Sequence, residues 1–170
     1  FAGNSADRGG GMHNDWSSSP TLTNCIFTGN TAKYGGGMYN DSESKPTLTN
    51  CIFEDNVADD GDGGAIYSEG IATLTNCEFT DNFAGLNGGG LYNRGCCYST
   101  ITDCTFTDNT ANFGGGAIYN DSWSGTISEC IFTSNSADFG GGMYNISRLP
   151  ELINCEFENN TAFDGGGMFN

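Results

Sequence analysis

The sequence has little positive charge, a single histidine and no long hydrophobic segment. Only five of its 170 residues are Lys or Arg, against 21 Asp and Glu, which gives a formal net charge of −16. We expect no nucleic-acid partner, because nucleic acids require clustered basic side chains. No apolar run of 18 residues is present, so we expect no transmembrane segment, and no signal peptide is recognisable. The lone His13 argues against a zinc site, which needs several converging ligands.

Helical periodicity is also missing. An amphipathic helix needs apolar residues at three- and four-residue spacing over ten or more positions, and Gly, Asn, Asp, Ser or Thr interrupts every such run. Short alternating segments such as 21–23, 25–27 and 37–39 are instead typical of β-strands separated by turns. The sequence therefore predicts an all-β protein with two or three short strands per repeat.

What the sequence does contain is an internal repeat of about 26 residues. A Cys recurs at intervals of 26, 26, 27, 26 and 25 residues, and a Phe follows each Cys by two positions. The predicted structural core includes these two columns: Cys25, Cys51, Cys77, Cys104, Cys130 and Cys155, with Phe27, Phe53, Phe79, Phe106, Phe132 and Phe157. Leu or Ile stands three residues before each Cys and Ala seven residues after it, and both columns are assigned to the interior as well.

A repeat of this length predicts a solenoid. A four-stranded propeller blade would need about 40 residues or more, so one coil of a parallel β-helix fits better. Neighbouring coils then pair as strands about 4.8 Å apart, and identical residues stack on one another. Stacked Cys side chains point the same way, which favours buried free thiols over disulfides.

Asn forms two further columns, five residues after each Cys and two residues after the large apolar residue that follows the glycines. We interpret them as structural, because a stacked Asn amide can bond inward-turned backbone groups and the Asn above and below it. The predicted ladders are Asn30, Asn56, Asn82, Asn109, Asn135 and Asn160, and Asn40, Asn93, Asn120 and Asn145. Ser68 interrupts the second ladder.

The tetrapeptides at 27–30, 79–82 and 106–109, which read Phe-x-x-Asn, and the Gly-Gly-Ala-Ile segments at 63–66 and 115–118 resemble the repeat of the polymorphic outer-membrane protein family of chlamydiae and its bacterial relatives. The resemblance covers the whole chain. It implies a right-handed parallel β-helix, extracellular or at the cell surface, with adhesion as the commonest role. The number of repeats in the sequence predicts six to seven coils. We therefore expect residues 1–170 to form a single domain, as a segment of a longer repeat protein or as a subunit that stacks end to end into a fibre.

Two groups of acidic residues are candidate calcium sites. Asp59, Asp60 and Asp62 lie in a glycine-containing loop, and Asp55, Asp81 and Asp108 are expected to stack on three successive coils. Closely spaced carboxylates suit calcium, which binds oxygen ligands. The alternative interpretation is a flexible acidic loop and a file of carboxylates that splay into water. Neither interpretation requires a cofactor, and calcium is the one candidate ligand.

A column of aromatic residues is expected to face outward. It contains the candidate partner-binding residues Tyr39, Tyr67, Tyr92, Tyr119 and Tyr144. Exposed Tyr rows suit contacts with sugars or proteins, although stacked rings also stabilise neighbouring coils by packing alone. Trp16 and Trp123, in nearby loops, could extend such a surface.

These patterns favour a structural or adhesive rod whose partner is another copy of itself, or a protein or glycan at a host or cell surface. A polysaccharide-binding or polysaccharide-modifying β-helix is the alternative, but the five bases do not cluster in the sequence, so no catalytic residues are assigned and no enzyme is expected. A further alternative is ice binding, because Thr residues flank the inward Leu/Ile column and would form two ladders. Cys96 and Cys97, in a loop insertion, allow a vicinal or intermolecular disulfide.

Overall fold

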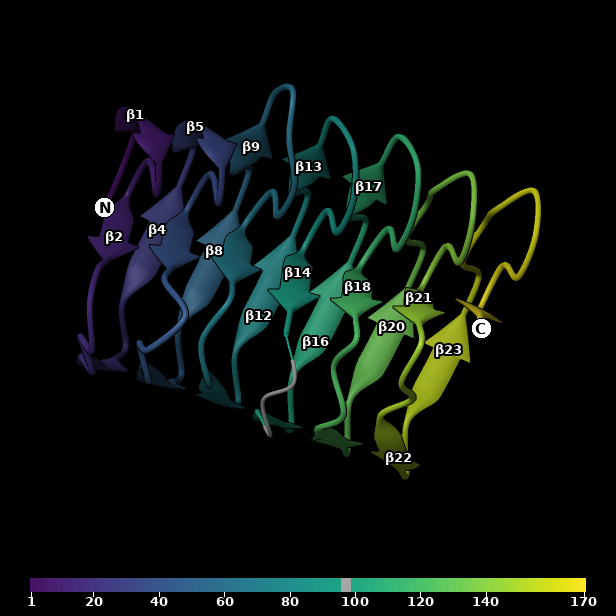
Figure 1. Ribbon diagram of the computed structural model, residues 1–170. Coiled ribbons are helices and arrows are strands. Elements are labelled where there is room, and N and C mark those ends of the chain that lie inside the picture. The colour runs from purple at the N-terminus through teal and green to yellow at the C-terminus, as the bar shows by residue number, and fades with distance from the viewer. Residues whose placement is uncertain (96–98) are drawn as a thin grey trace.

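The computed structural model describes residues 1–95 and 99–170, and all regular secondary structure in these ranges is β (Figure 1). The chain winds into coils that follow one another along a single axis, with the two termini at opposite ends of the row. Strands of successive coils pair in parallel and form four sheets. The predicted parallel solenoid of about 26 residues per coil is therefore confirmed, whereas the expectation of two or three strands per coil was too low.

Two of the sheets lie on either side of the Cys column. The Thr sheet consists of β3 (Thr21–Thr23), β7 (Thr47–Thr49), β11 (Thr73–Thr75), β15 (Thr100–Thr102), β19 (Thr126–Ser128) and β22 (Glu151–Ile153). The Phe sheet consists of β4 (Ile26–Thr28), β8 (Ile52–Glu54), β12 (Glu78–Thr80), β16 (Thr105–Thr107), β20 (Ile131–Thr133) and β23 (Glu156–Glu158). Each coil passes from the first sheet to the second through the turn that precedes its Cys.

The other two sheets lie on either side of the glycine clusters. The Ala sheet consists of β1 (Ser5–Arg8), β5 (Thr31–Tyr34), β9 (Val57–Ala58), β13 (Phe83–Ala84) and β17 (Thr110–Ala111). The Tyr sheet consists of β2 (Met12–Asn14), β6 (Met38–Asn40), β10 (Ile66–Ser68), β14 (Leu91–Arg94), β18 (Ile118–Asp121), β21 (Met143–Ile146) and β24 (Met168–Phe169). The loops between these two sheets cover the outer side of the Tyr column, as described below.

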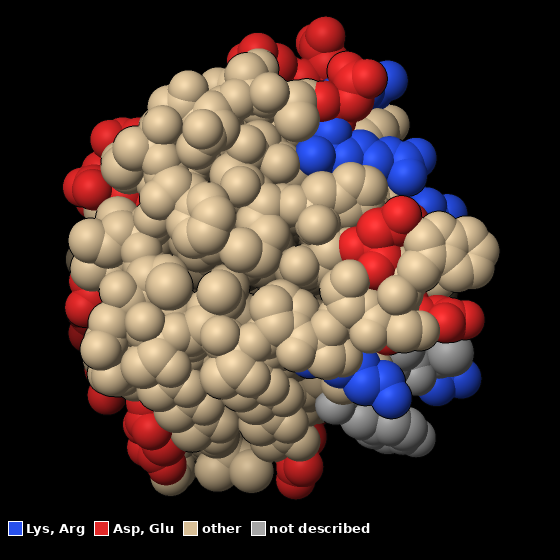
Figure 2. All heavy atoms as spheres, turned by 90° about the vertical axis from the view of Figure 1, so that its left-hand side faces the viewer, with Lys and Arg blue, Asp and Glu red and all other residues tan. Residues whose placement is uncertain are grey.

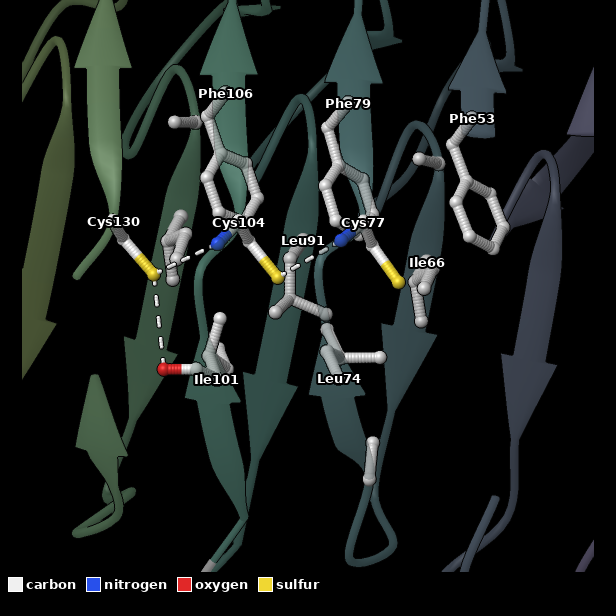
Figure 3. Close-up of a cluster of buried hydrophobic side chains, with 14 of the residues drawn as sticks. Phe53, Ile66, Leu74, Cys77, Phe79, Leu91, Ile101, Cys104, Phe106 and Cys130 are labelled. Atoms are coloured by element: carbon white, nitrogen blue, oxygen red, sulfur yellow. Dashed lines mark hydrogen bonds between the residues drawn. The ribbon is translucent and has the colours of Figure 1, made fainter. Parts of the chain in front are cut away.

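The register places identical residues directly over one another. Phe53 pairs with Phe79, and Phe79 pairs with Phe106. Their ring centroids are 5.1 and 4.5 Å apart, and the rings lie within 5° of parallel. Figure 3 shows these rings facing the Leu and Ile side chains of the opposite wall across a filled interior. Each fully buried large side chain contributes about 1.5–3 kcal/mol, so the interior columns supply most of the driving force for winding.

The Cys column completes this interior with thiols. The six Cys of the column are free within the described residues, and the four central ones are fully buried. The Sγ of Cys130 accepts a hydrogen bond from the Cys104 backbone N at 3.4 Å and donates to the Ile101 carbonyl at 3.7 Å (Figure 3). Burial raises the pKa of the Cys51 thiol. These thiols therefore behave as small core side chains that also satisfy backbone groups.

The first Asn ladder lies buried between the Phe and Ala sheets. The Nδ2 of Asn82 donates to the Oδ1 of Asn109 at 2.9 Å and to the Phe53 carbonyl at 2.9 Å. Its Oδ1 accepts from the backbone N and the Nδ2 of Asn56, both at 3.0 Å. The same pattern recurs from coil to coil, so each amide joins its neighbours on both sides.

The second ladder, along the Tyr sheet, is interrupted where Ser68 replaces Asn. Asn93 donates to Asn120 at 3.0 Å, and Asn120 donates to Asn145 at 2.7 Å. Ser68 instead donates to the Gly70 carbonyl, and within the described residues the buried Nδ2 of Asn40 has no hydrogen-bond partner. The interruption therefore leaves one buried donor unpaired in the middle of the rod.

Close packing of backbones explains the glycine clusters. A Cβ placed on Gly36 would lie 2.4 Å from the carbonyl oxygen of Gly64 and 2.5 Å from that of Val57. Backbone atoms cannot move away as flexible side chains can, so this column requires Gly at every coil. Trp123 shows a similar fit, because a Cβ on Gly125 would lie 2.2 Å from its ring. Trp123 is buried in the interior cluster, which corrects the expectation of a surface Trp at this position.

Candidate functional site: a polar groove beside the tyrosine stack

The Tyr column lies on the outer side of the Tyr sheet but is not an exposed row. Tyr39, Tyr67, Tyr92 and Tyr119 are each less than a tenth exposed, and Tyr144 is half-buried. The expectation of an exposed aromatic surface was therefore wrong for four of the five residues. The physical reason is that the loops before the strands fold over the rings.

Two contacts illustrate this cover. The Tyr34 ring packs against the Tyr67 ring at 5.6 Å, and a Cβ on Gly114 would lie 3.1 Å from the Tyr119 ring. Successive rings of the column stack at 4.8–5.1 Å, nearly parallel. Because the ring faces are occupied by one another, only ring edges and hydroxyl groups remain for a partner.

These hydroxyls open into a polar groove of about 360 Å³, in the size range of ligand pockets. Its wall is formed by residues of six strands of the Ala and Tyr sheets and of two loops: Arg8, Tyr34, Tyr39, Asp62, Tyr67, Glu69, Tyr92, Arg94 and Asp121. The wall thus combines two guanidinium groups, three carboxylates and phenol hydroxyls. We call it the Tyr groove.

A small network fixes the centre of the Tyr groove. The Nη1 of Arg94 lies 3.5 Å from Glu69 Oε1 and donates to the Tyr67 hydroxyl at 3.4 Å. The Tyr67 hydroxyl in turn donates to Glu69 Oε1 at 3.2 Å. At the N-terminal side the Arg8 guanidinium lies over the Tyr39 ring, 5.2 Å from its centroid. A guanidinium group, a carboxylate and a phenol hydroxyl are therefore held next to one another at the centre of the groove.

The groove keeps its phenols protonated. Burial raises the pKa of Tyr67 to about 12 and also raises the pKa of Tyr39. Burial, together with the nearby carboxylates of Asp62 and Asp121, also raises the pKa of Tyr92. Burial raises the pKa of Asp62 as well, although hydrogen bonds from the Asn87 side chain and backbone oppose the shift. At neutral pH the hydroxyls can therefore both donate and accept hydrogen bonds.

Two of the five bases line one groove although they are far apart in sequence. Arg8 and Arg94 line the same groove, so the premise that the bases do not cluster is corrected. Figure 2 shows basic side chains on one side of the end-on view, interleaved with acidic ones, while acidic groups alone mark the opposite edge. The position after the second Asn ladder could have signalled this mixture, since Glu69, Arg94 and Asp121 occupy it on three successive coils.

The three Asp residues of the acidic loop do not lie around one site. Asp62 faces the Tyr groove, whereas Asp59 and Asp60 are exposed and line a separate hollow beside Lys33. Within residues 1–95 and 99–170, no group of three potential ligands is arranged to hold a metal ion. Calcium binding there stays a prediction, and a higher melting temperature with added calcium would support it.

The stacked Asp residues suit the backbone conformation of the turns in which they lie. Asp55, Asp81 and Asp108 are exposed and adopt left-handed conformations with φ of 53–54°. Asp, Asn and Gly adopt this conformation most readily, and Gly29 and Asn159 occupy the same position in other coils. The turn geometry is therefore a sufficient reason for these three acids.

The Thr ladders lie on the Thr sheet as expected. Five strands place Thr over Thr at the first position, and four do so at the third, before Ser128 and then Ile153 follow. These side chains are half-buried or exposed, while the Leu and Ile between them face the core. The predicted disulfide candidates Cys96 and Cys97 lie outside the described residues.

Comparisons with known proteins agree with this architecture. Residues 1–92 and 62–169 match the family model of the right-handed beta helix region. Neither the curated proteins nor the solved structures yielded a match. In the part of the chain that the structure describes, no helix has the length and apolar character needed to cross a membrane. The two matched segments together span nearly the whole chain, which belongs to the right-handed β-helix family.

Proposed function

We propose that the protein is a structural, adhesive β-helical rod that binds a glycan through the Tyr groove. The observation that carries the proposal is the groove itself, where Arg94, Glu69 and Tyr67 form a fixed network above a stack of identical rings. Unbroken register along four sheets supports a stiff scaffold, because each coil is tied to the next by paired strands and stacked rings. The rod would then present the groove at a defined position.

The composition of the groove favours a neutral polyhydroxyl ligand. Its three carboxylates and the net charge of −16 repel anions, while Arg8 and Arg94 repel cations. A sugar hydroxyl both donates and accepts, so it can pair with guanidinium, carboxylate and phenol groups placed side by side. Glycan binding therefore fits the groove better than binding of a strongly charged ligand.

A panel of neutral and charged oligosaccharides tests this proposal. Arg94→Ala should weaken binding of a neutral oligosaccharide by about tenfold, the loss expected for one hydrogen bond to a charged group. Lys45→Ala, an exposed base outside the groove, is the matched control and should change nothing. Equal affinity of both variants, or no binding of any neutral oligosaccharide, contradicts the proposal. Incubation of the same panel with the protein, followed by product analysis, tests the expectation that no glycan is cleaved.

The expected location and assembly form part of the same proposal. The Phe-x-x-Asn and Gly-Gly-Ala-Ile segments resemble surface-exposed repeat proteins, which supports an extracellular or cell-surface location. The stacked ladders would also allow one rod to continue into another copy. Electron microscopy of the protein at increasing concentration tests this, since end-to-end stacking predicts rods that lengthen.

Ice binding is a second candidate, favoured by the Thr sheet. Its Thr side chains repeat about every 4.8 Å along the stack and about every 6.6–6.8 Å along each strand. A regular grid of hydroxyls and methyls on one sheet suits a crystalline surface. Thermal hysteresis is the measurement, and Thr75→Tyr should abolish it, whereas Thr105→Tyr on the neighbouring Phe sheet should not.

A further inference from the structure

A second surface, on the outer side of the covering loops, is partly apolar. Leu86, Phe113 and Phe163 occupy one position of the covering loops, with Asp138 in the coil between Phe113 and Phe163, and we call these four residues the loop ridge. Backbone hydrogen bonds align them: Phe113 N donates to the Leu86 carbonyl at 2.8 Å, and Phe163 N donates to the Asp138 carbonyl at 2.9 Å. Phe139 pairs with Gly114 and Asp164 instead, and its ring packs against Phe169 of the Tyr column at 5.6 Å. Along the ridge, two neighbouring apolar side chains and one acid therefore precede Phe163.

The loop ridge has no cover among the described residues. Leu86 is 46% exposed and Phe113 is 45% exposed, although both lie in the middle of the rod. Large apolar side chains elsewhere on the same loops, such as Tyr34, pack onto the Tyr stack instead. Contiguous exposed apolar side chains rimmed by polar groups are typical of interaction surfaces.

A cavity of about 380 Å³ lies beside the loop ridge. Small side chains form its floor, with Ala111, Ala137 and Ala162 stacked on three successive coils, and Phe163 closes one side. Asp138 contributes a carboxylate to the wall. The cavity can therefore accept one large apolar side chain while an acid stands at its edge.

The negative charge of the protein determines which kind of partner can bind the loop ridge and its cavity. Asp138 is the charged residue that lines the cavity, and the whole chain carries a net charge of −16. A second copy of the chain or an anionic membrane would meet repulsion at this surface, whereas a basic partner would be attracted to it. We propose that the loop ridge and its cavity bind a short basic peptide segment of a partner protein, with a large apolar residue as the anchor and Lys or Arg on either side.

A fluorescent peptide of sequence Lys-Lys-Phe-Leu-Lys-Lys is the probe, and anisotropy is the measurement. Phe113→Ser should weaken its binding at least about tenfold, because a central aromatic contact carries much of the affinity of such sites. Leu149→Ser is the matched control, since Leu149 is 61% exposed in a different loop, and it should bind as the unmodified protein does. Melting curves of both variants verify that folding is retained.

Three results would overturn the proposal. The peptide could bind Phe113→Ser as well as the unmodified protein. A charge-matched peptide with Ser in place of Phe and Leu could bind equally well, which would indicate attraction by charge alone. Sedimentation could reveal a dimer that Phe113→Ser dissociates, which would make a second copy the occupant. The expected result is binding that requires both the Lys residues and the apolar anchor, and that weakens at high salt.

Discussion

Removing one amide from the first Asn ladder should destabilise the whole rod. Asn82 makes four side-chain hydrogen bonds at 2.9–3.0 Å, two through Oδ1 and two through Nδ2. In Asn82→Ala the buried backbone N–H of Asn56 loses its acceptor, and the Phe53 carbonyl loses a donor. An unsatisfied buried group costs about 1–3 kcal/mol, and each lost bond adds about 0.5–1.5 kcal/mol. We expect a loss of about 2–5 kcal/mol in the free energy of unfolding.

Chemical denaturation and thermal melting measure this loss. For a chain of this size, 1 kcal/mol lowers the melting temperature by about 2–4 °C, so the decrease should be at least about 4 °C. Asn112→Ala is the matched control, because Asn112 is exposed in a covering loop. Exposed substitutions usually change stability by less than about 0.5 kcal/mol. If the two variants differ by no more than this, the amide ladder does not stabilise the rod as argued.

Three further substitutions give distinct results. Ser68→Asn should raise the melting temperature, because it supplies an acceptor to Asn40 and a donor to Asn93; a lower value would mean that the site has no room for the amide. Gly36→Ala should prevent folding, as followed by circular dichroism, since its Cβ would overlap backbone oxygens; a folded variant would disprove the close approach. Asp62→Asn should stabilise the protein at pH 7. The raised pKa of the Asp62 carboxyl means that its contribution to stability is present at low pH and is lost as the pH rises through the folded pKa, so the gain should vanish at acidic pH.

The interior could be predicted because it repeats. Phe79 and Asn82 recur at fixed positions in every coil, and strand pairing converts fixed spacing into vertical stacking. Periodicity cannot show what covers a column from outside. Tyr119 was expected to be exposed because it alternates with inward residues, but the loop at Gly114 packs against its ring. Trp123 was missed for a related reason, since the space that it fills exists because Gly125 has no side chain.

The Tyr groove was not predicted, because its charged residues occupy repeated positions at which the residue type changes from coil to coil, as with Glu69, Arg94 and Asp121. Arg8 and Arg94 are far apart in sequence, and they approach because three turns of the rod place them along one wall. The loop ridge was missed as well. Leu86 and Phe113 both stand nine residues after a Cys, but the residue type at this position changes from coil to coil, and spacing alone does not show that these two side chains face outward. The candidate functional surfaces of this protein therefore lie at repeat positions where the residue type varies from coil to coil.

The amide ladder makes the length of the protein easy to change. In every coil the ladder Asn donates through Nδ2 to the Asn of the following coil and accepts through Oδ1 from the Asn of the preceding coil. A duplicated coil would therefore insert without leaving an unmatched group, and a deleted coil would let its two neighbours join. Genetic duplication and loss of whole repeats can then vary the reach of the molecule while the chemistry of each turn stays constant.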